Sequence, residues 1–257
     1  MTPGPLHILL TGAASGLGRG LALYFATKGH HLVLVDRNVD GLRETIELLG
    51  PAAERASAHV LNVTSAVQVR DLLASLGGRP VELLINDAGL QHVARLEDFP
   101  EEHWNLLVDV MVKGPFLLTQ AVLPGMRAAG FGRVVNIGSI HSLVASPFKS
   151  AYVAAKHGLL GLSKVLALET ADADITVNTV CPAYIRTPLV DAQIAAQARA
   201  HGMGEQEVMD RIMLGPMPKK QFITAEEVAA TIEFLASHAA HNITWQTIVI
   251  DGGWTAR

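Results

Sequence analysis

Short apolar runs of strand length alternate with longer segments of helical period along almost the whole chain. The predicted strands are Leu6–Leu10, His31–Val35, Ala58–Val63, Val81–Ile85, Arg133–Ile137, Ile175–Val180 and Thr247–Ile250. Their nearly continuous apolar character is typical of strands that are covered on both faces, as in a parallel sheet. Because strands and helices alternate, we predict an α/β protein with a doubly wound parallel sheet, formed as one domain by residues 1–257.

The overall composition agrees with one folded domain. The chain has 257 residues, of which 49% are apolar and only 17% are charged, so much of it must be buried. The net charge of −4 gives no electrostatic case for binding nucleic acid or an anionic membrane surface. One cysteine, Cys181, excludes an internal disulfide and fits a reducing compartment. The N-terminal residues lack the basic segment of a signal peptide, so we expect a soluble, cytoplasmic protein without a membrane partner.

A glycine-rich turn follows the first apolar run and leads into a segment of helical period, Leu17–Lys28. Glycines let the backbone approach a pyrophosphate closely, and the free N–H groups at the start of a helix can bind it. The turn therefore predicts a Rossmann-type dinucleotide site, with an ordinary strand-to-helix turn as the alternative. Its predicted cofactor contacts are Gly12, Ser15, Gly16, Leu17 and Gly18.

The second predicted strand leads directly into Asp36, about 20 residues after the glycines. A carboxylate there can accept both hydroxyls of an adenosine ribose and would repel a 2′-phosphate, which favours NAD over NADP. The adjacent Arg37 weakens this preference, because it can pair with a phosphate. The alternative is that Asp36 is a solvated turn residue.

Three residues predict the catalytic chemistry. Tyr152 and Lys156 are four residues apart, which on a helix puts both side chains on one face. A free tyrosine has a pKa of about 10, and we expect the Lys156 ammonium and the positive ring of NAD⁺ to lower it. Ser139 lies just after the fifth predicted strand, where its hydroxyl can hold the substrate oxygen. The set Ser139, Tyr152 and Lys156 thus predicts proton abstraction from a secondary alcohol, coupled to hydride transfer.

These motifs resemble those of the short-chain dehydrogenase/reductase family over essentially the whole chain. In that family the residues matching Ser139, Tyr152 and Lys156 are catalytic, and the glycine turn binds the dinucleotide. The resemblance implies a cofactor site that Tyr152 and Lys156 share with residues after later strands: Asn62, Val63, Asn86, Ala88, Gly89, Pro182, Ile185 and Thr187. Asp87 stands at the variable position of the Asn-Asp-Ala-Gly turn. Ala183 replaces the glycine that is usual in the family, a mild departure that we expect to shift the backbone slightly.

One departure from the family pattern is larger. A helix asparagine that helps to hold a proton-relaying water is replaced here by Met111, three residues before Gly114. A thioether is at best a weak acceptor and cannot donate a hydrogen bond. Either Met111 simply packs in a helix interface, or the proton leaves Tyr152 and Lys156 by another and slower route.

Polar residues near the catalytic set predict the substrate. Lys149 can bind an anion, and Gln91 and His141 can donate hydrogen bonds, which suggests a carboxylate close to the reacting carbon. Gln193 lies in the segment 188–218, which interrupts the alternation and is predicted to be a helical lid. Each of these residues alone is more often a solvated or satisfied loop or helix residue.

The segments around these residues closely resemble the D-3-hydroxybutyrate dehydrogenases of the family. The resemblance implies NAD-dependent, reversible oxidation of D-3-hydroxybutyrate to acetoacetate, and a homotetramer. It also implies a substrate site made of Gln91, Ser139, His141, Lys149, Tyr152 and Gln193. The alternatives are another short hydroxy acid or polyol, a 3-oxoacyl-thioester reductase, and a dinucleotide-binding regulator without catalysis. The histidine spacings and the single cysteine give no convincing metal site.

Overall fold

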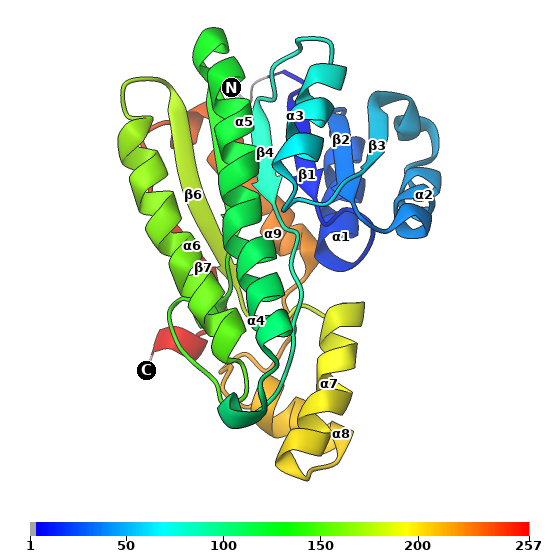
Figure 1. The fold of residues 1–257 in the computed structure, drawn as a ribbon, viewed down its shortest axis with the longest axis vertical. Helices are drawn as coiled ribbons and strands as arrows, with labels where there is room; N and C mark the ends of the chain where they lie inside the picture. Colours follow the sequence, from blue (N-terminus) through cyan, green and yellow to red (C-terminus); the bar gives the residue numbers. More distant parts are fainter. Residues whose placement is uncertain (1–3, 257) are drawn as a thin grey trace.

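The computed structural model describes residues 4–256, with the side chains of Pro188, Leu189 and Ala192 left aside. One parallel sheet runs through the molecule in the order β3-β2-β1-β4-β5-β6-β7, and helices cover both of its faces (Figure 1). Its strands are β1 (His7–Thr11), β2 (His31–Asp36), β3 (Ala56–Val60), β4 (Leu83–Asn86), β5 (Gly132–Ile137), β6 (Ile175–Pro182) and β7 (Thr247–Ile250). The predicted doubly wound α/β fold is confirmed.

The predicted strands are all present, and the largest difference in bounds is at β3. This strand ends at Val60 and not at Val63. The Asn62 side chain accepts hydrogen bonds from the Thr64 backbone N–H at 3.1 Å and from the Thr64 hydroxyl at 2.9 Å. This local turn bends the chain away from the sheet, which leaves Asn62 and Val63 in the loop beyond the strand.

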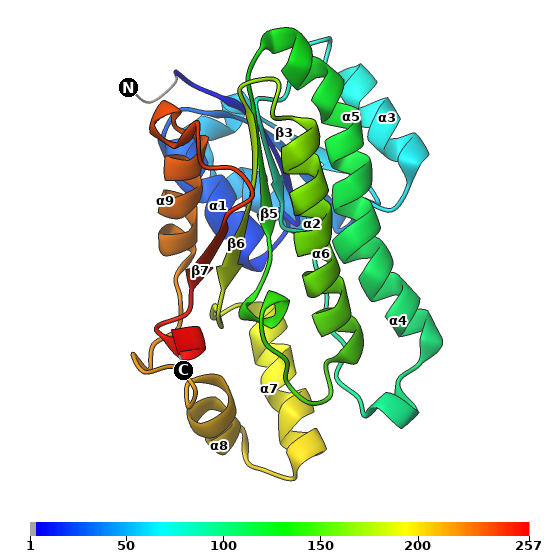
Figure 2. The ribbon, with the colours of Figure 1, turned by 90° about the vertical axis from the view of Figure 1, so that its left-hand side faces the viewer.

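The helices form two layers, which Figure 2 shows on either side of the sheet. One layer holds α1 (Gly16–Thr27), α2 (Val39–Leu48) and α9 (Ala225–Ala236). The other holds α3 (Ala66–Ser75), α5 (Gly114–Ala129) and α6 (Ser150–Glu169), with α4 (Glu101–Val108) leading into α5 through a π-helical turn at Asp109–Lys113. The remaining helices are α7 (Pro188–His201) and the short α8 (Glu205–Glu207), followed by a second π-helical turn at Val208–Met213.

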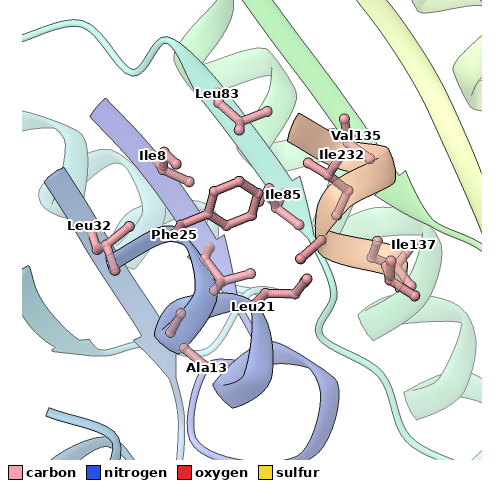
Figure 3. Packing of buried hydrophobic residues seen from close by; sticks show 14 of the residues in the cluster. Ile8, Ala13, Leu21, Phe25, Leu32, Leu83, Ile85, Val135, Ile137 and Ile232 are labelled. Atoms are coloured by element: carbon pink, nitrogen blue, oxygen red, sulfur yellow. The ribbon is translucent and has the colours of Figure 1, made fainter. Parts of the chain in front are cut away.

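Alternating side chains of each central strand pack into different layers. In β1, Ile8 and Leu10 join the core under α1 and α9, whereas Leu9 joins the core under α3 and α5. Figure 3 shows the first of these cores, in which the Phe25 ring lies among side chains of β1 and β4. Both faces are apolar because both are covered, so the strands read as continuous apolar runs.

The continuous helical segment Glu101–Ala129 is the one described helix that is long and apolar enough to cross a membrane. Its buried residues Leu117, Leu118, Val122 and Met126 belong to the core on the sheet. The helix therefore uses its apolar face inside the fold, as core helices of similar composition do.

Helices α7 and α8 project beyond the carboxyl end of the sheet (Figures 1 and 2). They have an apolar cluster of their own, in which Val190, Ile194, Val208 and Met213 are buried together with Tyr184. The segment 188–218 is helical at Pro188–His201, Glu205–Glu207 and Val208–Met213, so its predicted helical character is confirmed over these residues.

Candidate active site

A cavity of about 370 Å³ lies at the carboxyl ends of the strands, next to α7 and to the point where β1 and β4 carry the chain to opposite sides of the sheet. Doubly wound sheets bind their ligands at this position. Most of the predicted site residues line it together: Gly12, Ser15, Gly16, Leu17, Asp36, Asn62, Val63, Ala88, Gly89, Gln91, Ser139, His141, Lys149, Tyr152, Lys156, Pro182, Ile185, Thr187 and Gln193. Gly18 and Asn86 are not among the lining residues.

The glycine turn brings backbone close to backbone at the edge of this cavity. Gly12 has a φ of +74°, and a Cβ there would lie 3.1 Å from the Ala88 backbone. At Gly18 a Cβ would lie 2.2 Å from the carbonyl oxygen of Gly12, so this glycine permits the helix to pack under the turn. Ser15, the N-cap of α1, makes no side-chain hydrogen bond to the helix. The turn can thus offer N–H groups to a phosphate.

Asp36 closes β2 with its carboxylate held in place by the backbone. It accepts hydrogen bonds from the N–H groups of Ala14 at 3.2 Å and Asn38 at 2.9 Å. Asp36 and the exposed Arg37 both line the cavity. A fixed carboxylate at this position can accept ribose hydroxyls.

The ends of the central strands are tied together by side-chain hydrogen bonds. The Thr11 hydroxyl accepts the N–H groups of Asp87 and Ala88, each at 3.0 Å. The buried Asn86 amide donates to Asn136 at 2.8 Å, and Asn136 donates to the Ser163 hydroxyl of α6 at 2.9 Å. Asn86 therefore fixes the sheet edge behind the cavity, and we keep its contact with a cofactor as a prediction.

The three predicted catalytic residues come together at this edge. Tyr152 and Lys156 lie one turn apart on α6, with the Lys156 Nζ 5.7 Å from the centre of the Tyr152 ring. The Lys156 ammonium donates to the Ile137 carbonyl at 2.7 Å, which fixes the lysine to the end of β5. The Ser139 hydroxyl accepts the backbone N–H of His141 at 3.1 Å, and its own hydrogen can be donated to the His141 Nδ1 at 3.3 Å, to Tyr152 or to a ligand.

The protein alone does not favour the phenolate of Tyr152. Burial first, and then the nearby Asp87, raise the pKa of Tyr152 to about 12, although a hydrogen bond from Ser139 lowers it. Burial also lowers the pKa of Lys156 to about 8. The predicted lowering of the tyrosine pKa by Lys156 is therefore not seen in the protein alone, where desolvation is the largest influence on Tyr152.

The far end of the cavity holds a buried cation. Lys149 is 1% exposed, and its Nζ donates to the Tyr184 hydroxyl at 2.9 Å. Burial lowers the pKa of Lys149 to about 8, so at neutral pH the ammonium remains largely charged. Phe148, just before it, has a φ of +68°, a strained conformation that fixes the direction of the chain entering α6.

His141 completes this end as a neutral ring. Its Nε2 lies 2.9 Å from the Ser146 hydroxyl and its Nδ1 lies 3.3 Å from the Ser139 hydroxyl. Burial, and then the charge of Lys149, lower the pKa of His141 to about 3. The ring can therefore donate one hydrogen bond and accept one, but it adds no charge.

Three buried side-chain amides in or near the cavity each have one polar atom without a partner within residues 4–256. These atoms are the Gln91 and Gln197 side-chain nitrogens and the Gln193 side-chain oxygen. Unpaired buried polar groups are costly in a closed core, and at a cavity they indicate a polar ligand. The structure thus brings the predicted residues Gln91 and Gln193 together with Lys149 at the site.

Sequence reasoning missed three residues here. Tyr184 lies within a segment that was assigned to the cofactor alone, yet its hydroxyl contacts Lys149. Gln197 follows Gln193 by one helical turn, and that spacing predicts a shared face. Asp87 lines the cavity under the glycine turn, and burial raises its pKa to about 7. An acidic residue in an otherwise neutral turn was the available signal.

The two family departures have different structural consequences. Ala183 is not among the described non-glycine residues with positive φ, so it adopts this backbone without strain. Met111 is 1% exposed in the π-helical turn, and its Sδ lies 3.8 Å from where a Cβ of Gly89 would be. It packs in an apolar cluster with Leu107, Ala151 and Tyr152. In the part of the chain that the structure describes, no group of His, Cys, Asp and Glu has the arrangement of a metal site.

Comparison with known proteins agrees with this geometry. Residues 6–198 match the short chain dehydrogenase family. The chain is 42% identical over 253 residues to the D-beta-hydroxybutyrate dehydrogenase of Rhizobium meliloti, covering 97% of this chain and 98% of the relative. It is 37% identical over 254 residues to the enzyme of the same name from Cupriavidus necator, covering 97% of each. A variant of the actinorhodin polyketide ketoreductase solved with NADPH superposes with a TM-score of 0.93 at 30% identity, covering 100% of both chains.

Proposed function

The chain belongs to the short-chain dehydrogenase family, and on that premise we propose that this oxidoreductase converts D-3-hydroxybutyrate reversibly to acetoacetate with NAD. One observation carries the choice of substrate. Lys149 is a buried cation, and no carboxylate in residues 4–256 lies within ion-pair distance of it. A charge buried in this way needs an anionic partner, which a substrate carboxylate supplies. The names of the two bacterial relatives support the same substrate.

The site has separate places for the two ends of such a substrate. The carboxylate would lie at Lys149 with Gln91, His141 and Gln193 around it, and the hydroxyl would lie at Ser139 and Tyr152. Fixing a short molecule at both ends orients the hydrogen that leaves from the carbinol carbon. A short hydroxy acid is therefore a better fit than an uncharged alcohol.

Proton transfer rests on Tyr152. In the oxidation Tyr152 takes the hydroxyl proton as general base, with the Ser139 hydroxyl holding the substrate oxygen, and in the reverse reaction it returns that proton. A nicotinamide bound here would supply the acceptor for the hydride of the carbinol carbon, and its positive charge would favour the phenolate of Tyr152. Lys156, held by the Ile137 carbonyl, adds positive charge on the same side.

The residues of the cofactor end fit a dinucleotide. Gly12 packs so closely on the Ala88 backbone that a Cβ would crowd it, and Ser15, the N-cap of α1 without a side-chain cap bond, lines the cavity beside it. Asp36 supports NAD over NADP because its carboxylate would repel a 2′-phosphate. Asn62, Val63, Pro182, Ile185 and Thr187 would line the rest of the bound dinucleotide.

We further propose that the protein works as a cytoplasmic homotetramer in ketone body metabolism, and that the segment 188–218 closes over the bound substrate. Phe116 on α5 and Val165 and Leu168 on α6 are large apolar side chains that are 42%, 50% and 78% exposed. Helices α5 and α6 lie side by side on the outside of the molecule (Figure 1). Exposed apolar groups on neighbouring helices support an interface between subunits. Light scattering on the purified protein measures the subunit number.

The test of the proposed function follows NADH formation by absorbance, with D- and L-3-hydroxybutyrate and with NAD and NADP. We expect turnover with the D-acid and NAD only. Turnover with the D-acid and NADP at equal efficiency would overturn the role given to Asp36. If neither acid reacts although NADH binds, the substrate is wrong, and other short hydroxy acids and polyols are the next panel.

A further inference from the structure

The anion end of the cavity has more hydrogen-bond donors than acceptors. Lys149 has three N–H donors, and in the described structure it uses one of them on the Tyr184 hydroxyl. Two further donors, the side-chain nitrogens of Gln91 and Gln197, are buried without a partner, against one unpaired acceptor, the Gln193 side-chain oxygen. A surplus of this kind calls for a ligand that is rich in acceptors, such as a carboxylate.

Tyr184, like Lys149, is buried at this end of the cavity. It is 6% exposed, and its ring lies 5.9 Å from that of Trp254 and 6.5 Å from that of His141. Its oxygen accepts the Lys149 N–H at 2.9 Å, and the Gln197 amide, whose nitrogen forms no hydrogen bond within the described residues, lies close enough to lower the Tyr184 pKa. Burial raises the pKa of Tyr184, so the hydroxyl keeps its hydrogen at neutral pH.

The hydrogen of this hydroxyl has no acceptor within the described residues. Lys149, which hydrogen-bonds the oxygen, is a donor and cannot receive this hydrogen, and Tyr184 donates no hydrogen bond to any of residues 4–256. Leaving a buried donor unpaired is unfavourable unless a bound ligand accepts its hydrogen bond. The hydroxyl lines the same cavity as Ser139 and Lys149.

We propose that Tyr184 is a substrate-binding residue, which donates its hydroxyl hydrogen to the carboxylate that Lys149 binds, and that Gln197 positions it. The inference rests on the proposed function, because it adds two residues to the same carboxylate site. A phenol and an ammonium that share one contact present their remaining donors side by side, which matches two carboxylate oxygens. Tyr184 also belongs to the apolar cluster of α7, so the carboxylate would contact a residue that packs directly against the lid.

The experiment compares the acid with its uncharged methyl ester. The variant Tyr184→Phe keeps the ring against Trp254 and His141 and removes only the hydroxyl. We expect kcat/KM for D-3-hydroxybutyrate to fall about 10- to 100-fold, mainly through KM, because a hydrogen bond to a charged group is lost. The kcat/KM for the methyl ester should fall by less than about threefold, and the Kd for NADH should not change. Gln197→Leu should give a smaller fall in kcat/KM, again larger for the acid than for its methyl ester.

Tyr24→Phe is the matched control. Tyr24 donates to Glu233 at 2.6 Å on the far side of the sheet and has no part in the site, so kcat/KM should be unchanged. A loss that is equal for acid and ester would mean a structural role for Tyr184 and would overturn the proposal, as would no loss at all.

A binding measurement separates this proposal from the proposed function. Acetate is used as a plain carboxylate probe, and its effect on the melting temperature of the NADH complex is measured. We expect acetate to stabilise the wild type more than Tyr184→Phe, whatever hydroxy acid the enzyme oxidises. Absence of turnover with 3-hydroxybutyrate would overturn only the substrate, whereas equal stabilisation of both proteins by acetate would overturn the role of Tyr184.

Discussion

Lys149 shows how one residue can serve binding and reduce stability at once. Its ammonium is buried, and its hydrogen-bond partner is a neutral phenol rather than a carboxylate. The lowered pKa, about 8, means that burial disfavours the charged form in the folded protein. A buried charge without a counter-charge persists in a fold when a ligand needs it.

We therefore expect Lys149→Met to raise the melting temperature at pH 7 by several degrees, while KM for the hydroxy acid rises by at least about 30-fold. Methionine has a similar length and no charge, so the cost of burying the ammonium disappears together with the anion site. Between pH 8 and 10.5 the wild type gains stability as Lys149 loses its proton, so the difference in melting temperature should narrow there. Lys164→Met, at an exposed position of α6, is the control and should leave KM unchanged. A lower melting temperature for Lys149→Met would contradict the argument.

Residues that sequence reasoning found share a regular position. Asp36 and Ser139 come within two residues of the ends of predicted strands, and Tyr152 and Lys156 have helical spacing, so the pattern itself places them at one edge of the sheet. Tyr184 and Gln197 could not be assigned in this way. Their role depends on which hydrogen bonds Lys149 makes and leaves open, and that accounting requires coordinates.

Among the elements, the π-helical turn at Asp109–Lys113 holds the main departure from the family pattern. The turn is present although Met111 replaces the usual asparagine, so the irregular backbone does not depend on that side chain. Met111 contacts the apolar cluster that includes the Tyr152 ring. The position is therefore close enough to the catalytic tyrosine to affect proton movement.

We expect Met111→Asn to change kcat or its pH dependence, because an amide can hold a water where a thioether cannot. Met111→Leu is the matched control, since it keeps the apolar packing and adds no hydrogen-bonding group. Steady-state rates of both variants from pH 6 to 9 make the measurement. If Met111→Asn follows the wild-type profile, the position has no part in the proton path.

The segment 188–218, which we propose as a lid, packs mainly on itself. Ile194 of α7 is buried in the lid cluster with Tyr184 and Met213, whereas Ile232 of α9 is buried in the main core. The Phe148 and His201 rings, 4.9 Å apart, add a contact between the lid and the loop before α6. Local opening of the lid can therefore occur without loss of the main core.

The same substitution in the two clusters tests this separation. Ile194→Ala should raise KM for the hydroxy acid and speed proteolysis within residues 188–218, with little change in the main unfolding transition. Ile232→Ala should instead cost about 2–5 kcal/mol of global stability, as expected for a cavity in a dense core. Limited proteolysis and thermal melts distinguish the two outcomes. Equal loss of global stability in both variants would show that the lid unfolds together with the sheet.

The elements themselves were predictable to within a few residues because their periodicity is strong. Strand β3 is the exception in its bounds, since the hydrogen bonds of Asn62 to Thr64 end it early and apolar periodicity does not register such a turn. The lid was predicted as a segment but not as a cluster of its own, because sequence spacing does not show which apolar side chains of α7 and the second π-helical turn meet.

For the whole molecule, the doubly wound sheet gathers buried titratable groups at one edge, and their effects on stability have opposite signs. The pKa of Asp87 is raised to about 7 by burial, although the charge of Lys156 lowers it. The pKa of His141 is lowered to about 3, again by burial first. Between pH 4 and 6.5 the folded protein holds an extra proton on Asp87, while the unfolded chain holds one on His141. Rising pH therefore removes stability through Asp87 and adds it through His141, so the two effects largely cancel.

Replacing one member of this balance should expose the other. Asp87→Asn removes the loss of stability that Asp87 causes as the pH rises. The free energy of unfolding of the variant should therefore increase relative to the wild type from pH 4 to 7, and the difference should stay constant above pH 7. The gain is bounded by the pKa change at about 4 kcal/mol. Asparagine has nearly the same shape as aspartate, so it still fits beneath Gly12 and Gly18. Thermal melts of both proteins at several values between pH 5 and 8 test the idea, with Asp40→Asn on the exposed start of α2 as the control. If the difference in melting temperature does not change over this range, Asp87 is ionised in the folded protein throughout. The charge of Lys156 would then lower the Asp87 pKa by more than desolvation raises it.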